Sequence, residues 1–207
     1  MTALRLQYIV LADLVGSTKF TARMGNDMGI ARMREFEDAA REALVLMKPP
    51  TSGKIVKAEG DGVLLVFDHF PDIVHWNFEF HDSLQTKRMP DGTFRLRMGG
   101  RVDPMKARIW VHIGEVHLEE NDVRGLAVNE LHKIEQAAKP NAPEGAVILT
   151  HLARDLAITS LYPKQCKLRR FDRAKLEGRP LIRLYQLVVK ADIAFVRDRQ
   201  LRAGMDV

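Results

Sequence analysis

Two short apolar segments, each with an aspartate beside a glycine or close to one, constrain the fold of this chain more than any other feature. The first, I-V-L-A-D-L-V-G-S-T, contains Asp13 and runs into Gly-Ser-Thr, which is typical of a strand, a tight loop and a helix start. The second, K-I-V-K-A-E-G-D-G-V-L-L-V-F, contains Asp61 and predicts an antiparallel hairpin with the aspartate at its tip. Both carboxylates are therefore expected at the end of a strand.

The two aspartates predict a site where a cation and phosphate groups meet. A divalent cation held by carboxylates can bridge phosphate oxygens, and the free amides and dipole of a helix N-terminus favour the same anion. The predicted helix opens at Ser17 or Thr18, directly after Asp13 and its loop. Aspartate is also a common turn residue and helix cap, and that purely structural role is the alternative for either residue taken alone.

The composition is that of one globular domain. The chain has 207 residues, 46% hydrophobic and 29% charged, which is enough for one buried core. Its longest apolar stretches, such as Val63 to Phe67, are far shorter than the roughly 20 residues of a membrane-spanning helix. Arg5, Gln7 and Asp13 interrupt the apolar N-terminal segment, so no signal peptide is expected. The single cysteine, Cys166, fits a reducing compartment. We expect a cytoplasmic protein with no membrane partner.

The net charge of +5 and the isoelectric point near 9.4 raise the question of nucleic-acid binding. Basic patches lie at 167–173 and 197–202, but neither contains a recognisable nucleic-acid-binding motif. A solvated basic face is the preferred interpretation, and no nucleic-acid partner is expected. Such a surface also attracts nucleoside triphosphates.

Hydrophobic periodicity divides the chain into strands and helices in a regular order. We expect strands at 7–14, 54–57, 63–67, 107–118, 147–150, 165–171 and 181–189, and helices at 17–47, 70–88, 125–138 and 151–158. Glycine and proline signals make 89–104 a long loop. The order predicts an α+β fold, a ferredoxin-like βαββαβ sandwich with an additional C-terminal hairpin and an antiparallel-rich sheet flanked by helices. One domain is expected at 1–190, with a charged tail at 191–207.

Four ordered segments resemble the catalytic domain of the class III nucleotidyl cyclases, the family of adenylate and guanylate cyclases. They are A-D-L-V-G-S-T, K-A-E-G-D-G-V-L-L-V-F, R-I-W-V-H-I-G-E-V and N-D-V-R-G-L-A-V-N-E-L-H-K-I, and the closing K-L-E-G-R-P-L-I-R-L-Y hairpin is similar as well. The resemblance runs from Tyr8 to Leu187 and keeps the family's order and spacing. It implies conversion of a nucleoside triphosphate to a 3′,5′-cyclic nucleotide and pyrophosphate.

The resemblance also implies a metal site. Asp13 and Asp61 would bind two divalent cations, Mg²⁺ or Mn²⁺, and the backbone carbonyl of Leu14 would complete a metal shell. Two ions about 3.5–4 Å apart can lower the pKa of the ribose 3′-hydroxyl and stabilise phosphate charge during in-line attack. The next four residues would hold the β- and γ-phosphates with their backbone donors; they are Val15, Gly16, Ser17 and Thr18.

In this family a lysine and an Asp or Thr read the base, and Lys57 and Asp122 stand at those positions. A lysine can donate to adenine N1 and an aspartate can accept from the N6 amine, so ATP is expected rather than GTP. Without the resemblance, Lys57 would be a solvated charge at a strand end and Asp122 a residue of a polar turn. Guanylate cyclase activity is the weaker alternative.

Two positions depart from the family pattern. An asparagine and, four residues later, an arginine stabilise the transition state in the family; Asn129 fits the first role, but Lys133 stands at the second. Positions i and i+4 share a helix face, yet an ammonium lacks the planar two-pronged contact of a guanidinium. Many relatives also carry a lysine where this chain has Glu177, and Lys175 and Arg179 flank that position. Slow turnover is expected.

The family's site is composite, because the metal and base-reading residues come from one domain and the asparagine helix from another. Both sets occur in this one chain, so the resemblance implies a homodimer arranged head to tail with two equivalent sites. The alternative function is a catalytically weak or inactive cyclase homology domain that binds nucleotide or dimerises. Lys133 and Glu177 favour this alternative.

Overall fold

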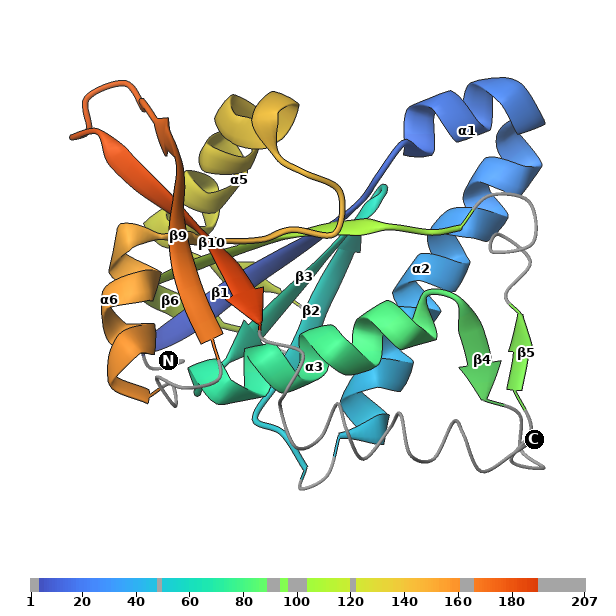
Figure 1. Cartoon of the computed structure of the whole chain (residues 1–207), viewed down its shortest axis with the longest axis horizontal. Coiled ribbons are helices and arrows are strands. Elements are labelled where there is room, and N and C mark those ends of the chain that lie inside the picture. The colour runs from blue at the N-terminus through green and yellow to red at the C-terminus, as the bar shows by residue number, and fades with distance from the viewer. Residues whose placement is uncertain are drawn as a thin grey trace.

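The computed structural model describes residues 4–47, 50–88, 94–96, 104–119, 122–160 and 166–189. These residues form one large mixed sheet with helices packed on both of its faces (Figure 1). The described helices are α1 (Ser17–Met24), α2 (Asn26–Leu46), α3 (Phe70–Ser83), α5 (Leu126–Ala138) and α6 (His151–Ser160). The expected α+β fold is confirmed.

The sheet has eight strands in the order β2-β3-β1-β6-β8-β10-β9, with β7 paired to β6. The strands are β1 (Leu4–Leu14), β2 (Lys54–Glu59), β3 (Gly62–Phe67), β6 (Ala107–Leu118), β7 (Val123–Arg124), β8 (Val147–Thr150), β9 (Cys166–Ala174) and β10 (Ile182–Val189). Only β6 and β8 pair in parallel, so the sheet is rich in antiparallel pairs as expected. The βαββαβ unit is β1, α1 with α2, β2, β3, α3 and β6.

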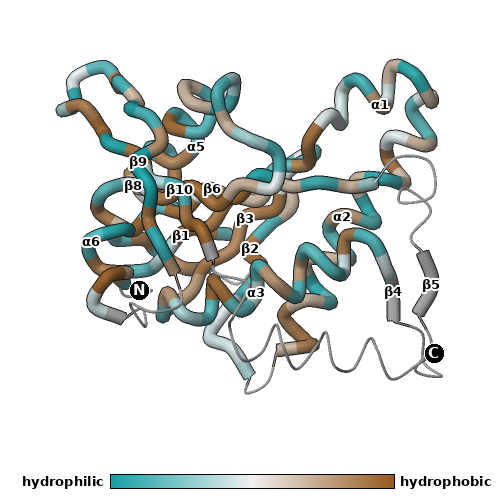
Figure 2. The backbone as a smooth tube through the Cα atoms, in the orientation of Figure 1, coloured by the Kyte–Doolittle hydropathy of each residue, from teal (hydrophilic) through white to brown (hydrophobic). Residues whose placement is uncertain are grey.

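Residue alternation along β1 divides the core into two layers. Tyr8, Val10 and Ala12 pack in the layer that includes α2, α3 and α6, whereas Ile9 and Leu11 pack in the layer that includes α5. This is the period-2 pattern of a strand buried on both faces. Figure 2 shows the resulting concentration of apolar residues along the central strands. The candidate site residues at the strand ends therefore stand on a rigid support.

The single helix expected from Ser17 to Met47 is wrong in one respect, because Gly25 divides it into α1 and α2. Gly25 has φ 89°, a conformation that residues with a Cβ rarely adopt. The two helices then pack closely, since a Cβ at Gly29 would lie 2.3 Å from Oγ1 of Thr21. The apolar stripe is also shorter than expected, because Ile30 is 48% exposed.

The remaining differences are local. The helix expected at 70–88 ends at Ser83, and its last residues form β4 (Thr86–Arg88), paired with β5 (Phe94–Leu96). No strand was expected at β7, which is two residues long. Most of the long loop expected at 89–104, and the whole charged tail, lie outside the described residues.

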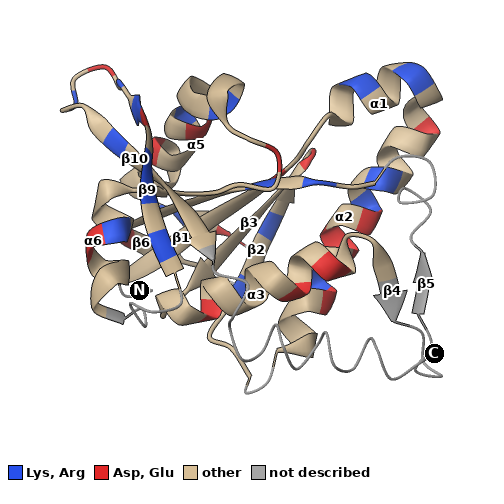
Figure 3. Ribbon diagram, in the orientation of Figure 1, with Lys and Arg blue, Asp and Glu red and all other residues tan. Residues whose placement is uncertain are grey.

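Within the described residues, no helix is long and apolar enough to cross a bilayer. The basic residues expected at 167–173 lie on β9, which forms one edge of the sheet. Figure 3 shows them as blue segments on β9, in contrast to the red segments along α2.

Candidate functional site

The structure brings Asp13 and Asp61 to the same end of the sheet. Asp13 pairs in register with Gly62, the residue directly after Asp61. The Leu14 amide donates to the Asp61 carbonyl oxygen at 2.9 Å, and the Ser17 hydroxyl donates to the Asp61 carboxylate. These contacts fasten the hairpin tip to the end of β1 and the start of α1.

Asp13 is the buried member of the pair. Its exposed fraction is 4%, and burial raises the pKa of its carboxyl group, while a hydrogen bond from Lys139 opposes that shift. The neighbouring carboxylates of Asp61 and Glu135 raise the pKa further. Asp13 therefore lies in an acidic cluster whose charge Lys139 and Arg108 partly balance.

A divalent cation fits this arrangement. Within the described part of the chain, Oδ2 of Asp13 is buried and accepts no hydrogen bond, which leaves an acidic oxygen without a close donor. The Nη1 atom of Arg108 is 3.6 Å away. The same residues contain no group of three or more His, Cys, Asp and Glu side chains that could hold a metal ion, whereas the expected site needs only Asp13, Asp61 and the Leu14 carbonyl.

The loop after Leu14 presents backbone donors at the start of α1. Gly16 has φ 73° and is the N-cap of the helix, and no side chain caps it. The first turn thus leaves amides for an anion, as helix N-termini do. The Val15 amide differs from the expectation, because it donates to the Lys106 carbonyl oxygen at 2.9 Å. Gly16, Ser17 and Thr18 remain as candidate phosphate donors.

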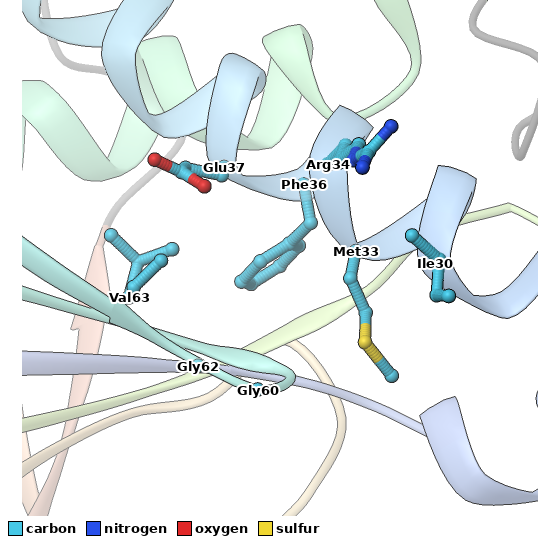
Figure 4. A pocket seen from close by; sticks show the side chains of 9 residues that line it. Ile30, Met33, Arg34, Phe36, Glu37, Gly60, Gly62 and Val63 are labelled. Carbon is cyan, nitrogen blue, oxygen red and sulfur yellow. The ribbon is translucent and has the colours of Figure 1, made fainter.

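A cavity of about 220 Å³ opens between α2 and the β2–β3 hairpin. Figure 4 shows Met33 and Phe36 of α2 pointing toward the hairpin, where Gly60 and Gly62 flank Asp61. The walls of this cavity are mostly apolar, with Arg34 and Glu37 as its charged lining residues. The cavity adjoins the carboxylate end of the sheet, and such walls are typical of small-molecule sites.

Lys57 and Asp122 lie together, as the base-reading hypothesis requires. Nζ of Lys57 is 3.3 Å from Oδ1 of Asp122 and 2.6 Å from Oε1 of Glu59. The hydrogen bond to Glu59 raises the pKa of Lys57. The Arg124 guanidinium lowers the pKa of Asp122, with help from the Val123 amide. The lysine is thus charged and the aspartate is an acceptor at neutral pH.

Asn129 and Lys133 lie on α5, and both are exposed. Neither side chain forms a hydrogen bond or an ion pair with any other residue that the structure describes. Leu126, on the same part of the helix, is 62% exposed. The structure therefore does not bring this pair into the Asp13 and Asp61 cluster of its own chain.

The turn between β9 and β10 carries the second departure from the family pattern. Glu177 is exposed there. Arg179 in the same turn pairs with Glu130 of α5 at 2.7 Å, and Glu130 is also 3.5 Å from the buried His112. The buried His112 is also hydrogen-bonded to Thr150 at 2.9 Å, so it is a packed, hydrogen-bonded core residue.

Two cationic residues at the site were not predicted from the sequence. Nζ of Lys139 donates to Oδ1 of Asp13 at 2.7 Å, and Arg108 approaches the other carboxylate oxygen. Arg108 opens β6, the neighbour of β1, so the strand order could have indicated it. Lys139 follows the end of α5 and has only one local signal, its i, i+4 spacing from Glu135.

The fold of this chain is similar to that of known proteins. No family model matches the sequence, and no curated protein does. Among solved structures, the adenylyl cyclase CyaB from P. aeruginosa has a TM-score of 0.67 and 17% identity, and the match covers 94% of this chain and 100% of that chain. An adenylate/guanylate cyclase/hydrolase from Silicibacter pomeroyi has a TM-score of 0.62 and 22% identity, with coverage of 92% and 100%.

A guanylate cyclase domain is similar as well. The domain of RhGC from Catenaria anguillulae, solved in complex with GTP, has a TM-score of 0.60 and 15% identity, and the match covers 91% of this chain and 99% of that chain. The chain has the fold of the class III adenylate and guanylate cyclase catalytic domain.

Proposed function

We propose that this chain is a nucleotide cyclase that works as a homodimer and converts ATP to 3′,5′-cyclic AMP and pyrophosphate. The observation that carries the proposal is the buried Asp13 carboxylate, one oxygen of which accepts no hydrogen bond from the residues that the structure describes. This carboxylate lies next to Asp61 and the N-terminus of α1, which no described side chain caps. The fold likeness supports the reaction class, since its members include both adenylate and guanylate cyclases.

Asp13, Asp61 and the Leu14 carbonyl would hold two divalent cations, Mg²⁺ or Mn²⁺. When bound, such ions acidify the ribose 3′-hydroxyl and neutralise charge on the triphosphate. The chain's own contribution is orientation. The amides of Gly16, Ser17 and Thr18 would bind phosphate oxygens, and the apolar cavity beside the hairpin would exclude water from the nucleoside.

The choice of ATP rests on Lys57 and Asp122. The two side chains lie 3.3 Å apart, so both can reach one edge of a base. In its charged form the lysine donates to adenine N1, and the aspartate accepts from the N6 amine. Guanine presents O6 and a protonated N1, which would leave the aspartate without a donor at O6.

The position of α5 supports the proposed homodimer. Lys139, just beyond the end of this helix, contacts Asp13, and Asn129 precedes it by ten residues. At 1.5 Å per residue, Asn129 lies roughly 15 Å from that contact along the helix. The short asparagine side chain cannot reach phosphates held at Asp13 of its own chain, which favours a site that α5 of a second chain, placed head to tail, completes.

The test is a chromatographic assay for cyclic nucleotide with ATP or GTP and Mn²⁺. We expect cyclic AMP from the wild type and from Asp155→Ala, which removes an exposed carboxylate of α6, but none from Asp61→Ala. Absence of any cyclic product at high enzyme concentration refutes the activity. Product that persists in Asp61→Ala refutes the metal assignment.

Mixing two inactive variants tests the composite site. Asp61→Ala and Asn129→Ala chains together form heterodimers in which one site keeps both residues. Half the dimers are mixed and each has one of two sites intact, so about a quarter of wild-type activity is expected. Two inactive variants that fail to complement each other contradict the head-to-tail arrangement.

A further inference from the structure

One ammonium group bridges two acidic side chains at the candidate metal site. Nζ of Lys139 lies 2.7 Å from Oδ1 of Asp13 and 2.9 Å from Oε1 of Glu135. The Asp13 side chain is almost fully buried, whereas that of Lys139 is 40% exposed. The carboxylate is therefore fixed in place, and the ammonium has room to move.

We propose that Lys139 is an internal counter-ion that occupies Asp13 in the metal-free protein and is displaced to Glu135 when a divalent cation binds. The inference rests on the proposed function, because it takes Asp13 as a metal ligand. It adds that metal binding at this site is an exchange of one cation for another, which weakens the apparent affinity for the metal.

The argument for exchange begins with the limited capacity of Asp13. Its Oδ1 atom accepts the Lys139 hydrogen bond, and its Oδ2 atom faces Arg108 at 3.6 Å. A dication that binds this carboxylate adds two positive charges beside two existing ones. Repulsion between cations so close in a buried setting is costly, and Lys139 is the one that can withdraw along its flexible stem.

Glu135 provides the position to which the ammonium moves. Its Oε1 atom is buried and already lies 2.9 Å from Nζ, within ion-pair distance. The acceptor is therefore in place in the metal-free protein. A small movement of Nζ away from Asp13 would keep this ion pair, so the displaced charge stays paired rather than becoming buried and alone.

The experiment measures Mn²⁺ binding by isothermal titration calorimetry on the full chain without nucleotide. Lys139→Met keeps an unbranched side chain, shorter by one atom, and removes the competing charge. Lys106→Met is the matched control, since Lys106 pairs with Glu144 at 2.8 Å on the surface and its loss changes net charge equally. We expect Lys139→Met to bind Mn²⁺ roughly tenfold more tightly than the control, the equivalent of one charge-assisted hydrogen bond no longer broken.

Thermal unfolding gives a second readout. In EDTA, Lys139→Met should melt below the Lys106→Met control because Asp13 loses its hydrogen bond, and Mn²⁺ should raise its melting temperature by more than that of the control. Glu135→Gln should bind Mn²⁺ several-fold more weakly than wild type, because the displaced ammonium loses its charged acceptor. Equal or weaker Mn²⁺ binding in Lys139→Met relative to Lys106→Met overturns the exchange.

The Asp61→Ala variant distinguishes failure of the cation exchange from failure of the metal site itself. Mn²⁺ binding that is lost in Asp61→Ala but unchanged in Lys139→Met overturns the exchange and leaves the metal site intact. Mn²⁺ binding that is the same in wild type and Asp61→Ala, or absent from wild type, overturns the metal site itself and the exchange with it.

Discussion

A close approach of α5 to the sheet at Gly114 predicts a large effect from adding a single methyl group. At Gly114 of β6, an added Cβ would lie 2.4 Å from the Cβ of Ala127 in α5. Two carbon atoms in contact prefer about 3.5–4.0 Å. Gly114→Ala therefore requires α5 and β6 to separate by roughly 1 Å or more, since Ala127 is buried and its methyl group cannot rotate out of the way.

Gly114→Ala should lower both the stability of the fold and the rate of turnover. Overpacking of this kind costs about 1–3 kcal/mol, and at about 2–4 °C per kcal/mol for a chain of this size the melting temperature should fall by about 2–12 °C. The displaced helix carries Asn129 and Lys133, which the proposed mechanism places against the substrate of the partner chain. A shift of about 1 Å in such groups can lower turnover about 100-fold.

Circular dichroism melting and the cyclase assay would measure the two effects on Gly114→Ala. The second variant, Ala127→Gly, removes the opposing methyl group at a helix cost of about 1 kcal/mol, and in the double variant it should restore turnover to the level of Ala127→Gly alone. Unchanged melting temperature and turnover in Gly114→Ala would refute the reasoning. A double variant that is as slow as Gly114→Ala would show that the steric contact is not the cause.

Three further outcomes follow from individual residues. Lys133→Arg should raise kcat by about 10²-fold, the usual value of one preorganised transition-state donor; an unchanged kcat means that Lys133 does not face the substrate. Lys57→Glu combined with Asp122→Ser should move the ratio of kcat/KM toward GTP, because a carboxylate accepts from guanine N1, and an unchanged ratio would remove both residues from base recognition. Burial lowers the pKa of His112 below its ordinary 6.5, so the unfolded chain binds more protons and the free energy of unfolding should fall as pH drops through 6.5. His112→Gln should flatten that slope in a denaturation series, and an equally steep slope would assign it to other groups.

Much of the fold could be predicted from the sequence, because its local signals and tertiary packing agree. β6 and β8 have the predicted bounds, and the hairpin of β2 and β3 carries Asp61 at its turn. Strong alternation or a glycine turn marks each of these elements. The break at Gly25 could not be predicted from periodicity, because the apolar spacing continues across it and only the backbone conformation at one glycine differs.

The residues of the candidate site also differ in how well the sequence predicts them. Asp13, Asp61, Lys57 and Asp122 follow from short motifs in which each residue belongs to a turn or strand end, and the structure places them in two adjacent pairs. Lys139 belongs to no motif. Its contact with Asp13 spans 126 positions of the chain and depends on the angle at which α5 crosses the sheet, which no local pattern encodes.

That crossing gives α5 a double role in the proposed dimer. Its exposed part, with Asn129 and Lys133, would face the substrate of the partner chain, whereas Lys139, just beyond its other end, contacts both Glu135 and Asp13 of the same chain. A cation that displaces Lys139 at one site therefore acts on the end of the helix that serves the other site. Helix and sheet meet closely at Gly114 and Ala127. Because close packing leaves no free space to absorb a local displacement, α5 should shift as a rigid body. Metal binding at the two sites should then be coupled, and the coupling should weaken in Lys139→Met.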